Sequence, residues 1–136
     1  MAEAEQRDSL YGGLAAWNRG DYEAALSYAH PEVVWRVEPF FPDMESVYTG
    51  HDEMRRFFKT FNEAWEENSL EVSRIVDQRP GQIYVEIRFR ARAREGLVVE
   101  SDFHQIYRYD DDDLLREFHG FIDGADARRE AGLDDG

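Results

Sequence analysis

The sequence predicts an α+β fold: a curved antiparallel sheet with three helices on its concave face. The first half of the chain repeats apolar residues at helical spacing, whereas the second half alternates apolar and polar residues in segments separated by turn residues. Helical segments followed by a run of strands are typical of α+β domains. With 136 residues, 42% of them hydrophobic, the chain is long enough for one core. We expect a single domain over residues 1–136, with its core at about residues 8–123 and a short tail at residues 124–136.

Two helices are expected before the first strand. They span about residues 3–18 and 22–29, and Gly20 and Asp21 separate them. Gly20 suits the left-handed position that ends a helix, and Asp21 suits the N-cap of the next one. Pro31 cannot continue the second helix, because proline lacks a backbone N–H.

A strand over residues 33–37 and an irregular loop over residues 38–48 are expected next. The third helix, over residues 51–67, has the clearest pattern in the chain. Apolar side chains recur there at i, i+3, i+4, i+7 and i+11, so that they form one stripe along the helix. The stripe consists of Met54, Phe57, Phe58, Phe61 and Trp65.

The rest of the chain is expected to form three consecutive hairpins. Pro80-Gly81 suits the centre of a type II turn, Gly96 suits a left-handed turn position, and the acidic run at residues 110–113 marks the third turn. Hairpins place neighbouring strands antiparallel, so the helices would cover one face of an antiparallel sheet. The expected strands are residues 70–77, 83–94, 98–109 and 114–123, followed by a short helical or frayed tail at residues 124–133.

The composition excludes several classes of function. A net charge of −14 repels phosphate backbones and anionic lipids, so we expect no nucleic-acid partner and no membrane partner. Cysteine is absent and the four histidines lack the spacing of a zinc motif, so we expect no metal and no cofactor. The N-terminus has no apolar signal segment, and no apolar run approaches the ~18 residues of a membrane span, so a cytoplasmic location is expected.

An arginine ladder, defined as Arg88, Arg90 and Arg92, follows one face of the strand at residues 83–94. Two registers of the next hairpin place this ladder differently. A three-residue loop lets the arginines oppose acids on the outer face, whereas a two-residue turn, which a family alignment implies, places them inside. We favour the outer position, because burying unpaired cations is costly unless an anionic ligand or buried carboxylates offset it. The outer register pairs Arg90 with Glu100 and Arg88 with Asp102.

The last strand contains the candidate catalytic residues, Glu117 and His119. They alternate with apolar residues on one face of the strand. A carboxylate and an imidazole in an apolar setting shift their pKa values in opposite directions and can exchange a proton. If Tyr107 opposes Glu117, then Gln105 opposes His119 and both point inward. The alternative is that both groups only satisfy hydrogen bonds at the mouth of a structural core.

Four motifs carry a resemblance to a known family. They are Asn18-Arg19-Gly20-Asp21, Tyr48-Thr49-Gly50, the arginine-rich hairpin and Phe121-Ile122-Asp123. Over nearly the whole chain the sequence resembles the SnoaL-like proteins of the nuclear transport factor 2-like (NTF2-like) superfamily, which includes polyketide cyclases and ketosteroid isomerases. The resemblance implies one pocket inside a cone, with the last strand lining it and supplying an acid or a base.

The resemblance does not extend to the isomerase site. Where that site has a tyrosine and two aspartates, this chain has Gly13, Val37 and Gln105. The Asp–Arg–Asp set of the limonene epoxide hydrolases has no match either. Steroid isomerisation by that mechanism is therefore not expected.

The resemblance favours acid–base chemistry, such as cyclisation, isomerisation or dehydration, on a hydrophobic carbonyl compound, with Glu117 and His119 moving the protons. The alternatives are a protein that binds or carries a hydrophobic ligand without chemistry, and a module that uses the fold to dimerise. The expected ligand-binding residues are Gln105, Tyr107, Phe103, Trp35, Glu38 and Tyr48.

A homodimer is expected through the sheet face that the three helices leave open. That face would carry Ile106, Phe118 and Ile122 among charged residues. Such an apolar strip favours association.

Overall fold

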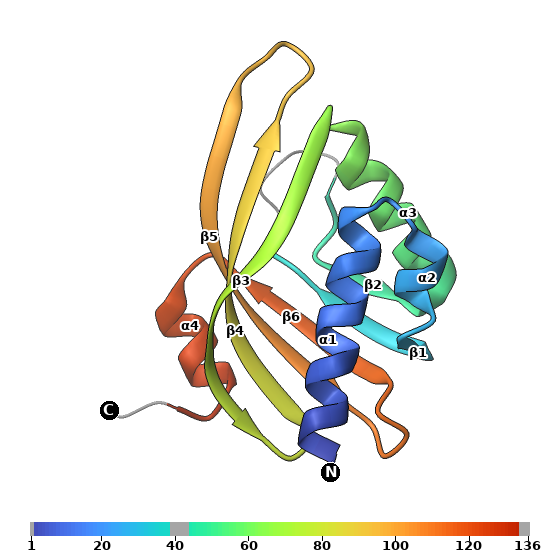
Figure 1. The fold of residues 1–136 in the computed structure, drawn as a ribbon, viewed down its shortest axis with the longest axis vertical. Coiled ribbons are helices and arrows are strands. Elements are labelled where there is room, and N and C mark those ends of the chain that lie inside the picture. The colour runs from blue at the N-terminus through green and yellow to red at the C-terminus, as the bar shows by residue number, and fades with distance from the viewer. Residues whose placement is uncertain (1, 39–43, 134–136) are drawn as a thin grey trace.

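The computed structural model describes residues 2–38 and 44–133 (Figure 1). Strand β2 begins within the segment predicted as a loop and ends one residue after it. Residues 39–43 of that segment are outside the described residues. None of the described helices is both long and apolar enough to cross a membrane. The helices are α1 (Ala2–Asn18), α2 (Tyr22–Leu26), α3 (Gly50–Glu63) and α4 (Gly124–Glu130). The strands are β1 (Ala29–Arg36), β2 (Val47–Thr49), β3 (Glu67–Arg79), β4 (Gln82–Arg92), β5 (Val98–Tyr109) and β6 (Leu115–Phe121).

The six strands form one sheet in the order β2-β1-β6-β5-β4-β3. Neighbouring strands are antiparallel except β1 and β6, which run parallel. Helices α1, α2 and α3 lie on one face of the curved sheet, and α4 lies on the opposite face (Figure 1). The predicted α+β cone is confirmed, but the sheet is mixed. A parallel pair needs a long connection, and here most of the chain lies between the two strands.

Local sequence explains how α1 leads into α2 and β1. Gly20 has a φ of +77°, and the Asp21 side chain accepts a hydrogen bond from Ala24 N–H at 3.1 Å, as expected of a C′ glycine and an N-cap. Helix α2 ends earlier than predicted, because the chain is already drawn into the sheet at Tyr28. The carbonyl of Tyr28 accepts a hydrogen bond from Leu115 N–H at 2.8 Å.

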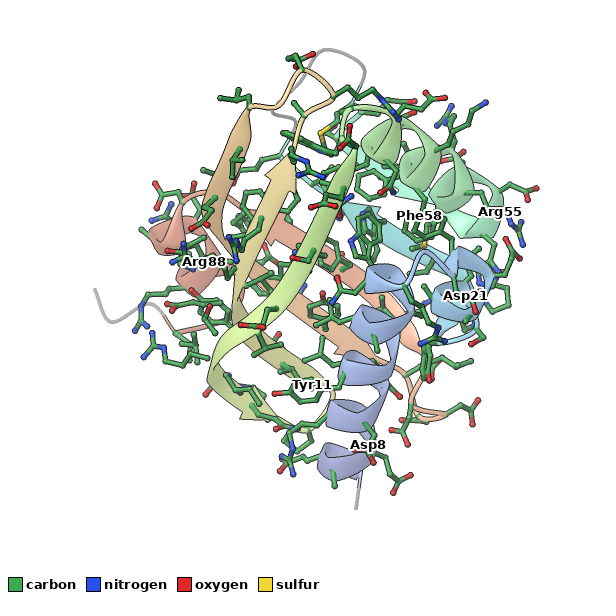
Figure 2. The ribbon with its side chains drawn as sticks, turned by 45° about the horizontal axis from the view of Figure 1, so that its top comes forward. Asp8, Tyr11, Asp21, Arg55, Phe58 and Arg88 are labelled. Atoms are coloured by element: carbon green, nitrogen blue, oxygen red, sulfur yellow. The ribbon has the colours of Figure 1, made fainter. Side chains whose placement is uncertain are left out.

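The main core lies between the three helices and the concave face of the sheet. Trp17 of α1 packs against Phe58 and Phe61 of α3, with ring centroids 5.3 and 5.4 Å apart. Figure 2 shows Phe58 between α3 and the α1–α2 pair. Fully burying one such side chain stabilises the fold by about 1.5–3 kcal/mol. Four residues of the predicted stripe, Met54, Phe57, Phe58 and Phe61, therefore form the face that α3 buries. Helix α3 ends at Glu63, earlier than predicted, so Trp65 lies beyond it.

The β4–β5 hairpin has the register that places the arginine ladder outside. Ala93 N–H bonds to Leu97 O across a three-residue loop, in which Gly96 has a φ of +96°. Arg88 opposes Asp102 and points away from the three helices (Figure 2). The prediction for this ladder is confirmed by ion pairs of 3.1 Å from Arg88 Nε to Asp102 Oδ1 and 2.9 Å from Arg90 Nε to Glu100 Oε2.

The register between β5 and β6 differs from the prediction. Next to the turn the pairing is the predicted one, but a β-bulge at Arg116 then shifts it by one residue. Tyr107 consequently opposes Phe118 instead of Glu117. A shift of one residue exchanges the two faces of a strand. Phe118 therefore points toward the helices, and Glu117 and His119 point toward the outer face.

Helix α4 covers the outer face where β5 and β6 lie side by side (Figure 1). Ile106 is 0% exposed there and packs with Ala127 of α4 in a second, smaller apolar cluster. Phe118 is on the inner face, and of the predicted apolar strip only Ile122 is exposed, at 48%. The described residues thus contain no such strip on the outer face. A homodimer stays a prediction, without this support.

Candidate functional site

A cavity of about 120 Å³ lies between the three helices and the concave face of the sheet. Helices α1, α2 and α3 and strands β1, β3, β5 and β6 all contribute to its wall. For comparison, an apolar cavity of about 150 Å³ holds one benzene ring. The wall is dominated by aromatic and aliphatic side chains, including Leu10, Leu14, Trp17, Trp35, Phe57, Phe58, Phe61, Phe103 and Phe118.

Strand β5 places a row of polar groups on this wall. Gln105, Tyr107 and Tyr109 alternate along the strand, so all three line the cavity. The Tyr107 hydroxyl donates a buried hydrogen bond of 2.6 Å to Gln105 Oε1. This bond orients the amide of Gln105. No described residue accepts a hydrogen bond from its Nε2.

Burial keeps both tyrosines neutral. Burial raises the pKa of Tyr107 well above its usual range, with a smaller contribution from Tyr109. Burial likewise raises the pKa of Tyr109. Both side chains are therefore hydroxyl groups at neutral pH, where they can donate or accept a hydrogen bond but cannot act as anionic bases.

Strand β1 and the residue two positions beyond it add a second donor and a carboxylate. Trp35 stacks on Phe118 with ring centroids 3.8 Å apart. Its Nε1 is buried and has no acceptor among the described residues. Glu38 Oε1 accepts a hydrogen bond from Ile122 N–H at 2.9 Å. Glu38 is the one acidic side chain among the described residues that line the cavity.

Most of the predicted ligand-binding residues lie on the cavity wall, but Tyr48 does not. Tyr48 is 1% exposed and packs against Phe57 with ring centroids 5.1 Å apart. Its hydroxyl accepts a hydrogen bond from Glu45 N–H at 2.8 Å. Strand β2 holds Tyr48 in the core, so its predicted position was wrong. The residues found on the wall are Phe103, Gln105, Tyr107, Trp35 and Glu38.

The position predicted for Glu117 and His119 was also wrong, because the bulge in β6 turns them to the outer face. Glu117 accepts a hydrogen bond of 3.1 Å from Arg36 Nε and one of 2.9 Å from Arg108 Nη1. His119 Nδ1 lies 3.9 Å from Glu130 Oε1 of α4. Neither side chain lines the cavity. We call Arg36, Arg108, Glu117, His119 and Glu130 the outer-face network.

The outer-face network holds charges in place instead of exchanging protons with a ligand in the cavity. Burial opposes ionisation of Glu117, but hydrogen bonds from Arg108 and Arg36 outweigh it and hold the pKa of this carboxyl below its usual value. Burial lowers the pKa of His119, although Glu130 and Glu117 favour its charged form. Arg108 also bonds to Glu130 Oε2 at 3.0 Å, so this network ties α4 to the sheet.

Most positions on the wall were not predicted as site residues, among them Tyr109 and Gly13. Tyr109 shares the alternation of Gln105 and Tyr107, so the strand pattern contained a signal for it. Gly13 has no functional group, and the sequence indicated this position only through the comparison with the isomerase tyrosine. Within residues 2–38 and 44–133, no three His, Asp or Glu side chains come together as a metal site.

The sequence matches the family model of the SnoaL-like domain over residues 13–118. The chain belongs to the SnoaL-like family. This match confirms the resemblance seen in the sequence motifs. Among curated proteins, none matches this SnoaL-like chain significantly.

Several solved structures are similar to this SnoaL-like chain. An NTF2-like protein of unknown function from Burkholderia pseudomallei is 21% identical, with a TM-score of 0.76 over 92% of this chain and 95% of that one. TerC, co-crystallised with polyporic acid, is 16% identical, with a TM-score of 0.77 over 92% and 96% of the two chains. Rv0760c from Mycobacterium tuberculosis, in complex with estradiol-17β-hemisuccinate, is 15% identical, with a TM-score of 0.76 over 88% and 95%. At these identities the likeness shows the NTF2-like fold alone.

Proposed function

We propose that the protein binds a small, neutral, hydrophobic carbonyl compound in the cavity. The amide of Gln105 carries this proposal, because its Oε1 is occupied by Tyr107 and its Nε2 has no acceptor among the described residues. Gln105 lines the cavity and is 7% exposed, so its amide is available to a ligand there. The carbonyl oxygen of a ligand would accept the hydrogen bond that Nε2 can donate.

A second unsatisfied donor supports the same ligand class. Trp35 lines the cavity, and its Nε1 is buried without an acceptor among the described residues. A carbonyl oxygen has two lone pairs and can accept two hydrogen bonds. The aromatic side chains of the wall also favour a ligand with a ring.

The charge and size of the cavity support a neutral, ring-sized ligand. Among the described residues, no lysine, arginine or histidine lines the cavity, so an anion would find no counter-charge. The volume of about 120 Å³ is close to that of one ring. The relatives that were solved with polyporic acid and with estradiol-17β-hemisuccinate support a ligand that contains rings, although both of those ligands are acidic and larger than one ring.

The proposal is tested by two probes that differ only at the carbonyl oxygen. Acetophenone has this oxygen, and α-methylstyrene has a CH₂ group in its place. Quenching of tryptophan emission reports binding, because Trp17 and Trp35 line the cavity. Wild-type protein should bind acetophenone roughly three- to tenfold more tightly, the usual value of one net hydrogen bond.

The variant Gln105→Leu should reduce this preference, because it removes one of the two donors and leaves Trp35 Nε1. His119→Ala is the matched control: it lies on the outer face and should leave both affinities unchanged. If neither probe binds the wild-type protein, or if Gln105→Leu keeps the full preference, the proposal is wrong.

A second candidate function is acid–base chemistry on the bound carbonyl compound, as in a cyclisation, isomerisation or dehydration. Glu38 favours it, because this carboxylate shares the cavity wall with the unsatisfied donors and one of its oxygens is oriented by Ile122 N–H. Glu38 would remove a proton from the carbon next to the carbonyl. The electron pair would move to the carbonyl oxygen, which Gln105 Nε2 and Trp35 Nε1 would stabilise.

This chemistry is measured as exchange of the methyl protons of acetophenone for deuterium in D₂O, followed by NMR. Wild-type protein should accelerate the exchange, and Glu38→Gln should slow it by roughly 10²–10⁴-fold, the usual contribution of a positioned base. Glu117→Gln is the control and should have no effect. Exchange at the buffer rate in wild-type protein would leave binding as the function.

A further inference from the structure

Helix α1 contains two consecutive glycines near its centre, Gly12 and Gly13. Glycine weakens a helix relative to alanine, because its backbone loses more freedom on folding. Packing explains Gly12, since a Cβ there would lie 2.5 Å from the Tyr28 hydroxyl oxygen. Packing does not explain Gly13, where a Cβ would meet nothing within 4 Å among the described neighbours. Gly13 also lacks the positive φ that would require glycine.

The space in front of Gly13 is the cavity. Helix α1 runs along the concave face of the sheet (Figure 1). Because Gly13 lines the cavity, a side chain at this position would reduce the width that is left for a ligand. Gly13 occupies the middle of the helix face that borders the cavity. The lining residues from α1 are Ser9, Leu10, Gly13, Leu14 and Trp17.

The wall opposite α1 contains the polar groups of the site. Strand β5 contributes Gln105 and Tyr107 on the inner face of the sheet. A ligand whose oxygen bonds to Gln105 Nε2 therefore extends its ring into the space between β5 and α1. A side chain at position 13 would enter the same space.

We propose that Gly13 is a specificity-determining residue that sets the thickness of the ring the cavity accepts. This inference rests on the proposed binding of a neutral carbonyl compound and narrows it to ring ketones. The ring lies against the bare backbone of α1, and the absence of a Cβ allows a puckered, saturated ring as well as a flat aromatic one. With any larger residue at position 13, only the flat ring fits.

The test compares acetophenone with cyclohexyl methyl ketone, which has the same ketone and the same number of heavy atoms but a thicker, puckered ring. Calorimetric titration gives the affinities of wild-type protein and Gly13→Ala. The variant should bind the puckered ketone about 5- to 150-fold more weakly than wild-type protein does, the range that overpacking typically produces. Its loss of affinity for acetophenone should be smaller. Its melting temperature should rise by about 2–5 °C, because alanine favours the helix. Ala15→Leu, on an exposed position of the same helix, is the control and should leave both affinities unchanged.

Gly13→Ala is expected to weaken binding of the puckered ketone and to raise the melting temperature. These opposite effects on binding and on stability separate a ligand-binding role of Gly13 from a structural one. A lower melting temperature in Gly13→Ala would overturn the proposal, because the space would then be needed for packing. Equal losses for the two ketones, or no loss, would overturn it as well. If wild-type protein binds neither ketone, the proposed function fails and the role of Gly13 fails with it. If wild-type protein binds both and Gly13→Ala changes nothing, only the role of Gly13 fails.

Discussion

The inner and outer faces of β5 and β6 consist of alternate residues of the same two strands, yet their chemistry is opposite. On the outer face, Arg108 and Glu117 have charged partners within 3.1 Å, and one partner of Arg108 is Glu130 of α4. On the inner face, Gln105 Nε2 and Trp35 Nε1 have no acceptor among the described residues. The face with the titratable pair is therefore satisfied, and the face with neutral donors is not. In this protein, a pair of ionisable groups does not mark the binding face. An unsatisfied donor alone does not mark it either, because Trp65 Nε1 is also buried without an acceptor among the described residues but does not line the cavity.

The largest expected effect is a difference in the free energy of unfolding between variants of Phe118 and His119, which are neighbours in sequence but lie on opposite faces of β6. Phe118→Ala should lower the free energy of unfolding by about 3–5 kcal/mol, because it removes a buried ring that stacks on Trp35. His119→Ala should lower it by about 1 kcal/mol or less, as expected of a partly exposed side chain. Urea denaturation of both variants measures the difference. Similar losses for the two would mean that the faces of β6 are not assigned correctly.

A smaller effect is expected from acidification, which should weaken the outer face. His119 and Glu117 both have a folded-state pKa below the usual value, so the unfolded chain binds more protons and stability falls as the pH falls. The contribution of His119 is complete above its ordinary pKa of 6.5 and is lost as the pH falls through its lower folded value. The contribution of Glu117 is lost below its ordinary pKa of 4.5 in the same way.

Urea midpoints between pH 7.5 and pH 4 test this dependence. The variant His119→Gln should remove the upper part of the decline and keep the lower part, while Gln105→Leu, on the inner face, should keep both. Identical curves for wild-type protein and His119→Gln would show that burial does not lower the pKa of His119.

The smallest effect is expected in the arginine ladder. Arg90→Ala should lower the free energy of unfolding by about 0.2–1 kcal/mol, because the pair with Glu100 is exposed and screened by salt. The effect should shrink further in 0.5 M NaCl, roughly the regime where the Debye length falls well below 8 Å. A decrease of several kcal/mol in the free energy of unfolding, independent of salt, would mean that the ladder is buried against a partner. This result would support the predicted homodimer.

The β4–β5 hairpin could be predicted from the sequence because it is a local structure. A three-residue loop with Gly96 sets the register, and this register is the one that places Arg88 and Arg90 opposite Asp102 and Glu100. Charge pairing and apolar alternation agree there, so a one-residue slip would bury cations. For the same reason the apolar stripe of α3 and the glycine and aspartate that join α1 to α2 were predicted correctly.

The placement of the last strand and of α4 was decided only in three dimensions. The pairing of Tyr109 with Leu115 agrees with the turn, but the bulge at Arg116 shifts every later pair. No glycine or proline signals this bulge. At this point β6 also lies parallel to β1, a strand that is far away in sequence. A bulge reverses the faces beyond it, so a local pattern placed Glu117 and His119 in the cavity and the tertiary structure placed them outside.

The sequence alone determined the fold class, the helices, the hairpin register and the inward row on β5 that includes Gln105 and Tyr107, because these depend on periodicity and on contacts between near neighbours in the chain. Only the tertiary structure decided which face of β6 borders the cavity, that α4 covers Ile106, and that Gly13 faces open space. Each of these depends on segments that are distant in sequence and compete for the same strand or the same volume. The spacing of apolar and polar residues along the chain does not reveal such competition.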